Sequence, residues 1–321
     1  MSHPVRGTGT TTDRRSARTA GPAGGGRAGP GRRRVLAAAA GAGAGMLGLG
    51  ACARVDTAQA TDGGNLLQRL RKQGTVRLGI AGEIPYAYID RNGHLTGEAP
   101  TVAGEIFKRL GVPRVQPVPI DFGSLIPGLR SDQFDVIAAG MFINPTRCQQ
   151  VLFSDPDYQV QEALLVPQGN PKKLRTFDDI ARTKATMGVA TGGVEIGYAK
   201  ASGVPTARID IFNDPLSGLE GLQAGRMDCF TGTSLTLRQL LATGHHHGIE
   251  LTEPFVPVVG GKKQYGAGGY GFRPGETRLR DAFDGQLHAL RSSGELLRLI
   301  RPFGFTTTET TTLTAKELCR G

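Results

Sequence analysis

The chain has 321 residues, with 38 Lys and Arg against 28 Asp and Glu, and a formal charge of +10. A charge of this size would suit a nucleic-acid or anionic-membrane partner if it were spread over the fold. However, residues 1–51 contain eight Arg and one acidic residue, so the rest of the chain carries only +3, which argues against a nucleic-acid partner. With 39% hydrophobic residues the chain can fill one large or two modest domains, which excludes full disorder and a disulfide-stapled miniprotein.

The N-terminal segment has the pattern of an export signal over residues 1–51. Three Arg at positions 32–34 precede a short stretch rich in Ala and Gly, which ends in Leu-Gly-Ala-Cys at Cys52. A basic segment, a short apolar segment and small residues before a cleavage site predict a secretory signal rather than a membrane span. The ending resembles a bacterial lipoprotein box, and the Arg pair resembles a twin-arginine signal. These resemblances imply that Cys52 is a lipid anchor on the outer face of the cytoplasmic membrane and that residues 52–65 are a flexible tether.

The cysteines and histidines predict no metal site. Cys148, Cys229 and Cys319 have no Cys or His at zinc-ligand spacing. In an oxidising compartment they are candidates for a disulfide, and the sequence leaves all three pairings open. Consecutive histidines at 245–247 cannot readily turn three imidazoles onto one ion, so a solvated turn is the favoured interpretation.

The mature chain alternates predicted strands with predicted helices. Alternating apolar positions indicate strands, and apolar positions that share one helical face indicate helices. The expected strands are 75–81, 115–120, 135–139, 186–190, 209–212 and 227–231. The expected helices are 101–110, 124–130, 177–181, 194–201, 216–224, 234–242, 276–293 and 295–300. This order indicates βαβ units and an α/β fold with mainly parallel sheet.

The Gly-rich run at 265–272 is interpreted as a strand and not as a phosphate-binding loop. Its aromatic residues alternate with glycines, and Arg273-Pro274-Gly275 follows where a phosphate loop requires a helix. We therefore expect a crossover strand here and no cofactor.

Two segments 93 residues apart share a pattern of Ser, Gly, Leu and Asp. In the first segment these are Ser124, Gly128, Leu129 and Asp135, and in the second they are Ser217, Gly221, Leu222 and Asp228. Each set falls on a predicted helix, turn and strand. The recurrence therefore predicts two lobes of similar construction.

A series of short motifs runs in unbroken order from about residue 66 to 305. They are Val76-Arg-Leu-Gly-Ile80, Phe122-Gly-Ser-Leu-Ile-Pro-Gly-Leu129, Phe134-Asp-Val-Ile137, Pro145-Thr-Arg147, Val151-Leu-Phe-Ser-Asp-Pro156, Gly225-Arg-Met-Asp228 and Gly294-Glu-Leu-Leu297. The series resembles the polar-amino-acid class of extracellular solute-binding proteins of ABC importers, family 3. The resemblance implies a monomeric, non-catalytic receptor that captures a small ligand and delivers it to a membrane permease.

The same resemblance implies a two-lobed periplasmic-binding-protein fold of type II, with the ligand in a cleft between the lobes. Two crossover strands would join the lobes near 164–167 and 265–272, and hinge closure would trap the ligand. The expected ranges are 66–165 plus 268–321 for lobe 1 and 166–267 for lobe 2. Because the C-terminal tail would then return to the first lobe, Cys148–Cys319 becomes the favoured disulfide.

Within the family, the Arg that aligns with Arg147 clamps the ligand carboxylate. A planar guanidinium matches two carboxylate oxygens and stays charged at every relevant pH. The alternative is a surface Arg that pairs with Asp155. Opposite it, the N–H groups of Gly193 and Val194 precede a predicted helix and are expected to meet the same carboxylate, although a simple strand-to-helix turn would look alike.

The site departs from the amino-acid-binding pattern of the family. Phe142 stands where a small hydroxyl residue is usual, and Thr233 stands where an Asp holds the ligand ammonium. In exchange, the aromatic residues Tyr86, Phe122 and Phe142 occur at site positions, with Glu83 three residues before the first. Aromatic rings stabilise a delocalised or alkylated cation by about 0.5–2 kcal/mol each. The set therefore suits a zwitterion of this kind, and core packing is the alternative for each ring.

Three segments, 82–88, 95–100 and 232–235, resemble the ectoine and hydroxyectoine binders within the family. Ectoine is a cyclic amidinium carboxylate, which matches the expected cage, with Glu83 on the amidinium and Arg147 on the carboxylate. We therefore expect a receptor for ectoine-type compatible solutes. The alternatives are a receptor for a polar or basic amino acid or a betaine, and an enzyme of the same fold, such as a cyclic-acid dehydratase or a murein-cleaving module. For an enzyme, Glu83 would be the general acid.

Overall fold

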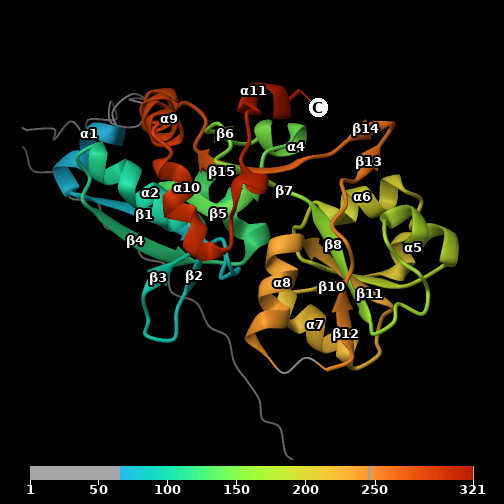
Figure 1. Ribbon diagram of the computed structural model, residues 1–321. Coiled ribbons are helices and arrows are strands. Elements are labelled where there is room, and N and C mark those ends of the chain that lie inside the picture. The colour runs from blue at the N-terminus through green and yellow to red at the C-terminus, as the bar shows by residue number, and fades with distance from the viewer. Residues whose placement is uncertain (1–65, 245–246, 321) are drawn as a thin grey trace, which may run out of the picture. The chain divides into compact units, whose positions relative to one another are not determined.

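The structure is a computed structural model that describes residues 66–244 and 247–320, so the predicted export signal, Cys52 and the predicted tether lie outside the described residues. One sheet contains β1 (Thr75–Ile80), β4 (Arg114–Pro119), β5 (Val136–Phe142), β6 (Leu152–Phe153), β7 (Tyr158–Val160) and β15 (Gly266–Phe272). Its order is β4-β1-β5-β15-β6, and β7 also pairs with β15 (Figure 1). The strands β4, β1 and β5 are parallel, whereas β15 runs antiparallel to its neighbours.

Helices accompany this first sheet, and the β2–β3 hairpin, formed by Tyr88–Ile89 and Leu95–Thr96, precedes the second of them. The helices are α1 (Leu66–Gln73), α2 (Glu98–Arg109), α3 (Leu125–Arg130), α4 (Pro145–Cys148), α9 (Thr277–Ser292), α10 (Glu295–Ile300) and α11 (Ala315–Leu318). Short 3-10 turns lie at Phe122–Ser124, Arg301–Phe303 and Thr307–Glu309. Helix α2 begins three residues before the expected 101. Pro100 fits its first turn because the N–H groups there have no partner within a helix.

The second sheet has the order β10-β9-β11-β8-β12. Its strands are β8 (Glu162–Pro167), β9 (Met187–Ala190), β10 (Ile209–Phe212), β11 (Cys229–Thr233) and β12 (Ile249–Leu251). Its helices are α5 (Phe177–Thr183), α6 (Glu195–Ala201), α7 (Pro215–Gln223) and α8 (Ser234–Thr243), with a 3-10 turn at Thr206–Arg208. A small hairpin of β13 (Val258–Val259) and β14 (Lys262–Lys263) follows. Two α/β lobes result, which confirms the predicted fold class.

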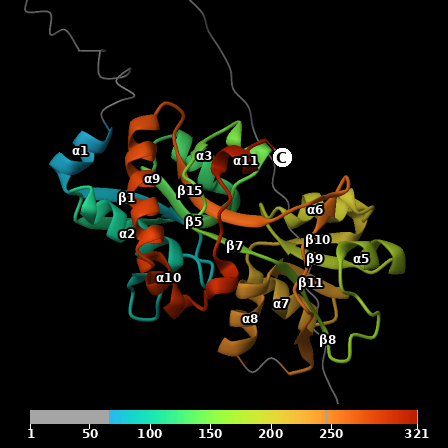
Figure 2. The same cartoon turned by 45° about the horizontal axis from the view of Figure 1, so that its top comes forward.

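The chain passes between the sheets twice, once after β7 and once before β15 (Figure 2). Strand β8 pairs with β11 from its first residue, Glu162, so residues 162–165 belong to the second sheet. The crossing therefore comes at Gln161, earlier than the expected 164–167 and the expected lobe boundary at 165. Strand β15 joins the first sheet at Gly266, which pairs with Val160, whereas lobe 1 was expected to resume at 268.

The recurring Asp has the same role in both lobes. The Asp135 carboxylate accepts a hydrogen bond from the Arg77 N–H at 2.9 Å, and the Asp228 carboxylate accepts one from the Thr186 N–H at 2.8 Å. In each case the Asp precedes a central strand and ties it to the start of the neighbouring parallel strand. The sequence recurrence thus reflects one helix-turn-strand unit used twice.

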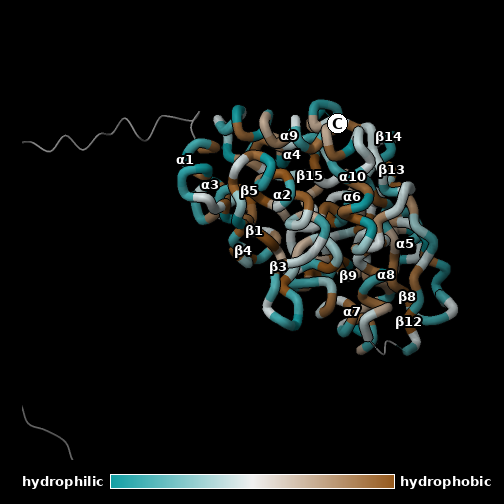
Figure 3. Tube along the Cα trace, turned by 60° about the vertical axis from the view of Figure 1, so that its left-hand side comes forward, coloured by the Kyte–Doolittle hydropathy of each residue, from teal (hydrophilic) through white to brown (hydrophobic). Residues whose placement is uncertain are grey.

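Both faces of each sheet are covered, which makes the central strands apolar throughout. In β5, Val136 and Ala138 pack in one hydrophobic cluster with α2 and α9, whereas Ile137 and Ala139 pack in another with α3. The period of two along a strand explains this division. Hydrophobic residues therefore follow the strands, and the tip of the β2–β3 hairpin is hydrophilic (Figure 3).

A pair of buried carboxyl groups joins α2 to the segment before β7. Glu98 is fully buried, and both of its carboxyl oxygens lack a donor among the described residues. Asp157 faces it and accepts a hydrogen bond from the Tyr270 hydroxyl at 2.7 Å. Burial, and then the charge of Asp157, raises the pKa of Glu98 well above its ordinary value. A carboxylic acid at Glu98 that donates to the Asp157 carboxylate gives one oxygen of each residue a partner.

Glu98→Gln is expected to remove part of the pH dependence of stability. Because the folded-state pKa of Glu98 is raised, its contribution to stability is present at low pH and lost as pH rises towards that pKa. The glutamine amide keeps a donor towards Asp157 and never ionises. The free energy of unfolding of the variant at pH 5 should lie within about 1 kcal/mol of the native value. Between pH 5 and pH 8 this free energy should decline less in the variant than in the native protein. Urea unfolding at both pH values measures this, with the half-exposed Glu105→Gln as control; equal declines would contradict the acid-pair interpretation.

Candidate functional site

A pocket of about 370 Å³ is lined by residues of both lobes. The first lobe supplies the loop after β1, the 3-10 turn at Phe122 and the end of β5, and the second supplies the loops after β9 and β10 and the start of α8. All the residues predicted for ligand binding lie in its wall: Glu83, Tyr86, Phe122, Phe142, Arg147, Gly193, Val194 and Thr233. The structure thus brings together side chains that are far apart in the sequence.

Arg147 enters the pocket from α4. The Asn144 side chain caps this helix by accepting a hydrogen bond from the Arg147 N–H at 2.9 Å, and Pro145 opens it. The guanidinium donates to the carbonyls of Phe142 at 2.7 Å and of Gly192 at 3.1 Å. It also lies over the Phe122 ring, 5.4 Å from the ring centroid. Since Arg has five N–H donors, further donors remain for an anion.

The alternative for Arg147, a surface ion pair with Asp155, is wrong. Arg147 is 9% exposed, and burial lowers its pKa from the ordinary value. The Asp155 carboxylate instead contacts His288 and the Ala315 N–H, each at 2.8 Å.

The three aromatic residues differ in how far they belong to the core. Tyr86 is 2% exposed and its ring stacks on Tyr158 with centroids 5.3 Å apart, so core packing and a pocket position coincide. Gly140 makes room for this ring, because a Cβ at that position would lie 2.5 Å from it. Phe142 is buried, whereas Phe122 is half-buried. All three rings line the pocket and are therefore available to a flat ligand.

A chain of hydroxyl groups crosses from the first lobe to the second and back. The Tyr86 hydroxyl donates to Thr233 Oγ1 at 2.9 Å, Thr233 donates to Thr236 Oγ1 at 3.1 Å, and Thr236 donates to Glu83 Oε1 at 2.7 Å. Thr233 also accepts from the Thr236 N–H and so caps α8. The series of donors thus ends at Glu83, and the Thr236 hydroxyl orients the Glu83 carboxyl group.

Glu83 is an acid of the pocket whose pKa lies near neutral pH. Burial raises its pKa to about 7, with a further increase from the charge of Glu195, while the hydrogen bond from Thr236 lowers it. A bound cation beside it would favour the ionised form. The arrangement can therefore hold a cation at Glu83 and an anion at Arg147.

Two acidic residues near the pocket were missed by the sequence analysis. Glu195 lines the pocket at the first position of α6, and burial raises its pKa although the charge of Arg147 opposes this. Glu162 is buried, one of its oxygens lacks a partner among the described residues, and burial with the charges of Glu195 and Glu83 raises its pKa. An acid in the first turn of a helix is a common stabilising feature, so nothing in the sequence marked Glu195 as a pocket residue. The third missed residue is Thr236, whose only signal was its place three residues after a cap.

The loop after β9 corrects one expectation. The Gly193 N–H donates to the Ala190 carbonyl at 3.1 Å, so it is not a free donor for a carboxylate. The reason is the tight turn that joins β9 to α6. A Cβ at Gly193 would lie 2.2 Å from a carboxylate oxygen of Glu195, so the Glu195 side chain would have to move to accommodate it.

The structure joins Cys148 to Cys319 by a disulfide and leaves Cys229 buried and reduced. Within residues 66–244 and 247–320, no group of three His, Cys, Asp or Glu side chains is placed to hold a metal. His245 and His246 lie outside the described residues. No helix in the described ranges combines the length and apolar character needed to cross a membrane.

The two lobes and the pocket between them define a ligand-binding protein of the two-lobed type II class. The chain belongs to the bacterial extracellular solute-binding proteins, family 3, whose model matches residues 76–306. Members of this family bind small ligands outside the cytoplasm for ABC importers.

Three relatives illustrate the family. A probable amino-acid ABC transporter periplasmic-binding protein of Sinorhizobium fredii is 32% identical over 79% of this chain and 85% of its own. The crystal structure of EhuB in complex with hydroxyectoine is 38% identical, covers 79% of this chain and 98% of that one, and superposes with a TM-score of 0.74. Cyclohexadienyl dehydratase of Pseudomonas aeruginosa is 24% identical over 72% of this chain and 82% of its own. The likenesses are thus mainly to transport proteins, with an enzyme among them.

Proposed function

We propose that this protein is the receptor of an ABC importer for ectoine-type compatible solutes. The observation that carries the proposal is the pairing of Glu83 and Arg147 in one pocket with three aromatic rings beside them. A cyclic amidinium carboxylate offers a flat cation to the rings and Glu83, and a carboxylate to the guanidinium. The relative solved with hydroxyectoine supports the same ligand class.

Calorimetry with purified protein tests the proposal. Ectoine or hydroxyectoine should bind with micromolar or better affinity, which corresponds to roughly −8 kcal/mol. Arginine, histidine and glycine betaine are measured in parallel, because they represent the alternative ligand classes. Tight binding of arginine or histidine without binding of ectoine would overturn the proposal.

Phe142→Ser restores the small hydroxyl that amino-acid binders carry and should weaken ectoine binding by about tenfold. The ring lost is one wall of the cage, and arginine affinity should not fall in parallel. Because truncation of a buried Phe costs roughly 3–5 kcal/mol of stability, folding is checked by circular dichroism. Phe177→Leu, a change in the core of the second lobe, is the control. An unchanged ectoine affinity in Phe142→Ser would contradict a role of the Phe142 ring in binding the ligand cation.

A second candidate function is a dehydratase that acts on a cyclic acid. The raised pKa of Glu83, about 7, is the specific observation in its favour, because a general acid needs such a value. A cyclohexadienyl dehydratase is also among the relatives of this chain, at 24% identity. Incubation with a cyclohexadienyl acid and detection of product would establish the enzyme, whereas the receptor proposal requires no turnover.

We further propose that the receptor acts as a monomer, exported by the twin-arginine route and held by a lipid on Cys52 at the outer face of the cytoplasmic membrane. The leader pattern and the extracytoplasmic place of the family support the export route and the lipid anchor, whereas the monomeric state follows only from the resemblance to the family. The permease would then meet a receptor that cannot diffuse away.

A further inference from the structure

The last 20 described residues, 301–320, return to the first lobe and end against α4 (Figure 1). The Cys148–Cys319 disulfide joins the end of this tail to the last residue of α4, across 171 residues of sequence. Ala315, Leu318 and Cys319 pack in the same hydrophobic cluster as Cys148. The tail is therefore attached to the helix that carries the ligand-facing Arg.

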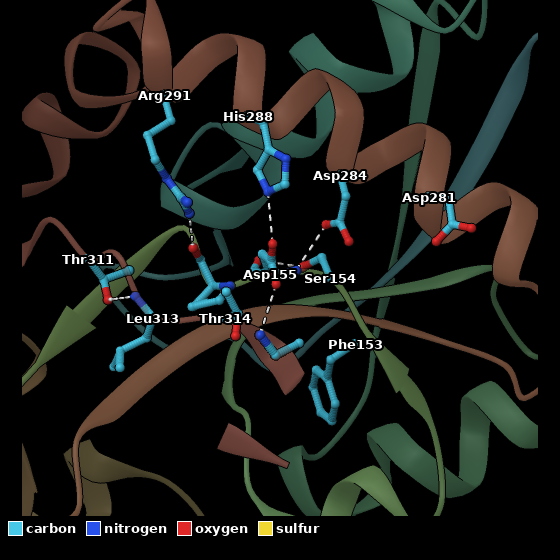
Figure 4. A network of polar contacts seen from close by, with 12 residues as sticks. Phe153, Ser154, Asp155, Asp281, Asp284, His288, Arg291, Thr311, Leu313 and Thr314 are labelled. Atoms are coloured by element: carbon cyan, nitrogen blue, oxygen red, sulfur yellow. Dashed lines mark hydrogen bonds and ion pairs between the residues drawn. The ribbon is translucent and has the colours of Figure 1, made fainter. Parts of the chain in front are cut away.

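Asp155 holds the other end of α11 (Figure 4). One of its carboxylate oxygens accepts the Ala315 N–H at 2.8 Å, and the other contacts His288 of α9 at 2.8 Å. The Asp155 N–H in turn donates to the Asp284 carboxylate of α9 at 2.9 Å. The tail is thus fixed at both ends of α11, to α9 through Asp155 and to α4 through the disulfide.

Besides the disulfide, α4 is held by the Asn144 cap, by the two hydrogen bonds of the Arg147 side chain and by its buried neighbours Ile143 and Val151. It has only four residues, and Pro145 and Thr146 are exposed. Of its side chains, Arg147 enters the pocket and Cys148 is the one that packs in the hydrophobic cluster. Because the two residues are consecutive, a shift of Cys148 passes directly to the Arg147 backbone.

We infer that the C-terminal tail is a positioning element for Arg147, acting through the Cys148–Cys319 disulfide. Without the disulfide, α4 would lose its covalent link and keep the Asn144 cap, the two hydrogen bonds of the Arg147 side chain and a small apolar contact, so the guanidinium would leave its place over Phe122 more often. The inference rests on the proposed function only for the ligand measurement below.

The first test needs no ligand. Phenylglyoxal modifies exposed guanidinium groups, and mass spectrometry gives the rate at each Arg. In Cys148→Ser, Cys319→Ser and the double variant, Arg147 should react about fivefold faster than in the native protein, as expected when a buried group is exposed by local opening. Arg226 lies exposed over Phe212 in the second lobe and should react at the same rate in all of them.

The second test measures binding of ectoine and of a cyclic amidinium compound that lacks the carboxylate. Each Cys variant should lose about tenfold in ectoine affinity, and the double variant no more than either single one, because all three remove the same link. Affinity for the carboxylate-free probe should be unchanged. Cys229→Ala removes a buried thiol from the second lobe and is the matched control for lost stability.

If a Cys variant does not fold, the folded native protein is treated with a water-soluble phosphine. The disulfide then becomes two thiols, with protons from water, and the phosphine takes the water oxygen as its oxide. Faster reaction of Arg147 after this treatment supports the inference. Loss of thermal stability with unchanged Arg147 reactivity and unchanged carboxylate-dependent affinity would overturn it. If native protein does not bind ectoine, the proposed function fails, whereas the reactivity comparison still decides the inference.

Discussion

Replacing Arg147 with alanine is expected to weaken ectoine binding by about 30-fold or more, because truncation of a buried charge partner costs roughly 2–5 kcal/mol. The guanidinium is 9% exposed and held over Phe122 by two backbone carbonyls, so it is ordered before the ligand arrives. Calorimetry at pH 8 measures the change.

Two variants sharpen this prediction. Arg147→Lys keeps the charge but loses the two-pronged geometry, so its affinity should lie between the native and alanine values. Arg226→Ala removes an Arg that also stacks on a Phe, with the guanidinium 5.3 Å from the Phe212 ring centroid, and it should bind ectoine normally. Equal affinity in Arg147→Ala and native protein would show that the carboxylate is held elsewhere.

Ectoine binding is expected to weaken by up to about tenfold per pH unit below pH 7, as one proton competes with the ligand cation. The free protein has a Glu83 pKa of about 7 that is raised chiefly by burial. The carboxylate form binds the cation, so affinity is complete above this pH and falls as pH decreases through it. Glu195 and Arg147 face the same pocket, and burial raises the pKa of the first and lowers that of the second. Titration by calorimetry from pH 5.5 to pH 8.5 gives the profile.

Changes at Glu83 and Thr236 separate the contribution of Glu83 to the pH profile from that of Glu195. Glu83→Gln should weaken binding at pH 8 by about tenfold or more and flatten the profile, because the charged partner is lost. Thr236→Val keeps the acid but removes the hydroxyl that lowers its pKa, so the midpoint of the profile should move to higher pH. Glu250→Gln, in β12 of the second sheet, should leave the profile unchanged. A native profile that is flat from pH 5.5 to pH 8.5 would contradict the role of Glu83.

Local patterns were sufficient for the longer strands and helices and for a fold of two α/β lobes, but they did not predict the helices α1, α4 and α11 or the short strands β6, β7, β12, β13 and β14. Apolar periods of two and near four residues are set by strand and helix geometry, so they can be read within ten residues of chain. The recurrence of Gly128 and Asp135 as Gly221 and Asp228 predicted two similar lobes, because these residues also have local roles in a helix-turn-strand unit. Asp135 and Asp228 each bond a neighbouring strand, and a Cβ at Gly128 would lie 2.8 Å from the Phe134 ring.

The resemblance to a family brought the eight predicted pocket residues together before any contact between them was known. It did not predict how they are held. Tyr86 bonds Thr233 across 147 residues, and Thr236 bonds Glu83 across 153 residues. No periodic pattern connects positions so far apart, because the spacing of a helix or strand carries no information about which lobe faces which.

The charges of the pocket depended on tertiary structure most of all. In the sequence, Glu195 is an acid at a helix start and Glu162 an acid in a strand. Burial beside Glu83 and Arg147 turns them into groups with raised pKa values. The tail that ends at Cys319 likewise became part of the Arg147 environment only through folding. Sequence alone established the kinds of side chain and the order of elements, whereas desolvation and distances between remote residues, which set charge and position, exist only once the chain has folded.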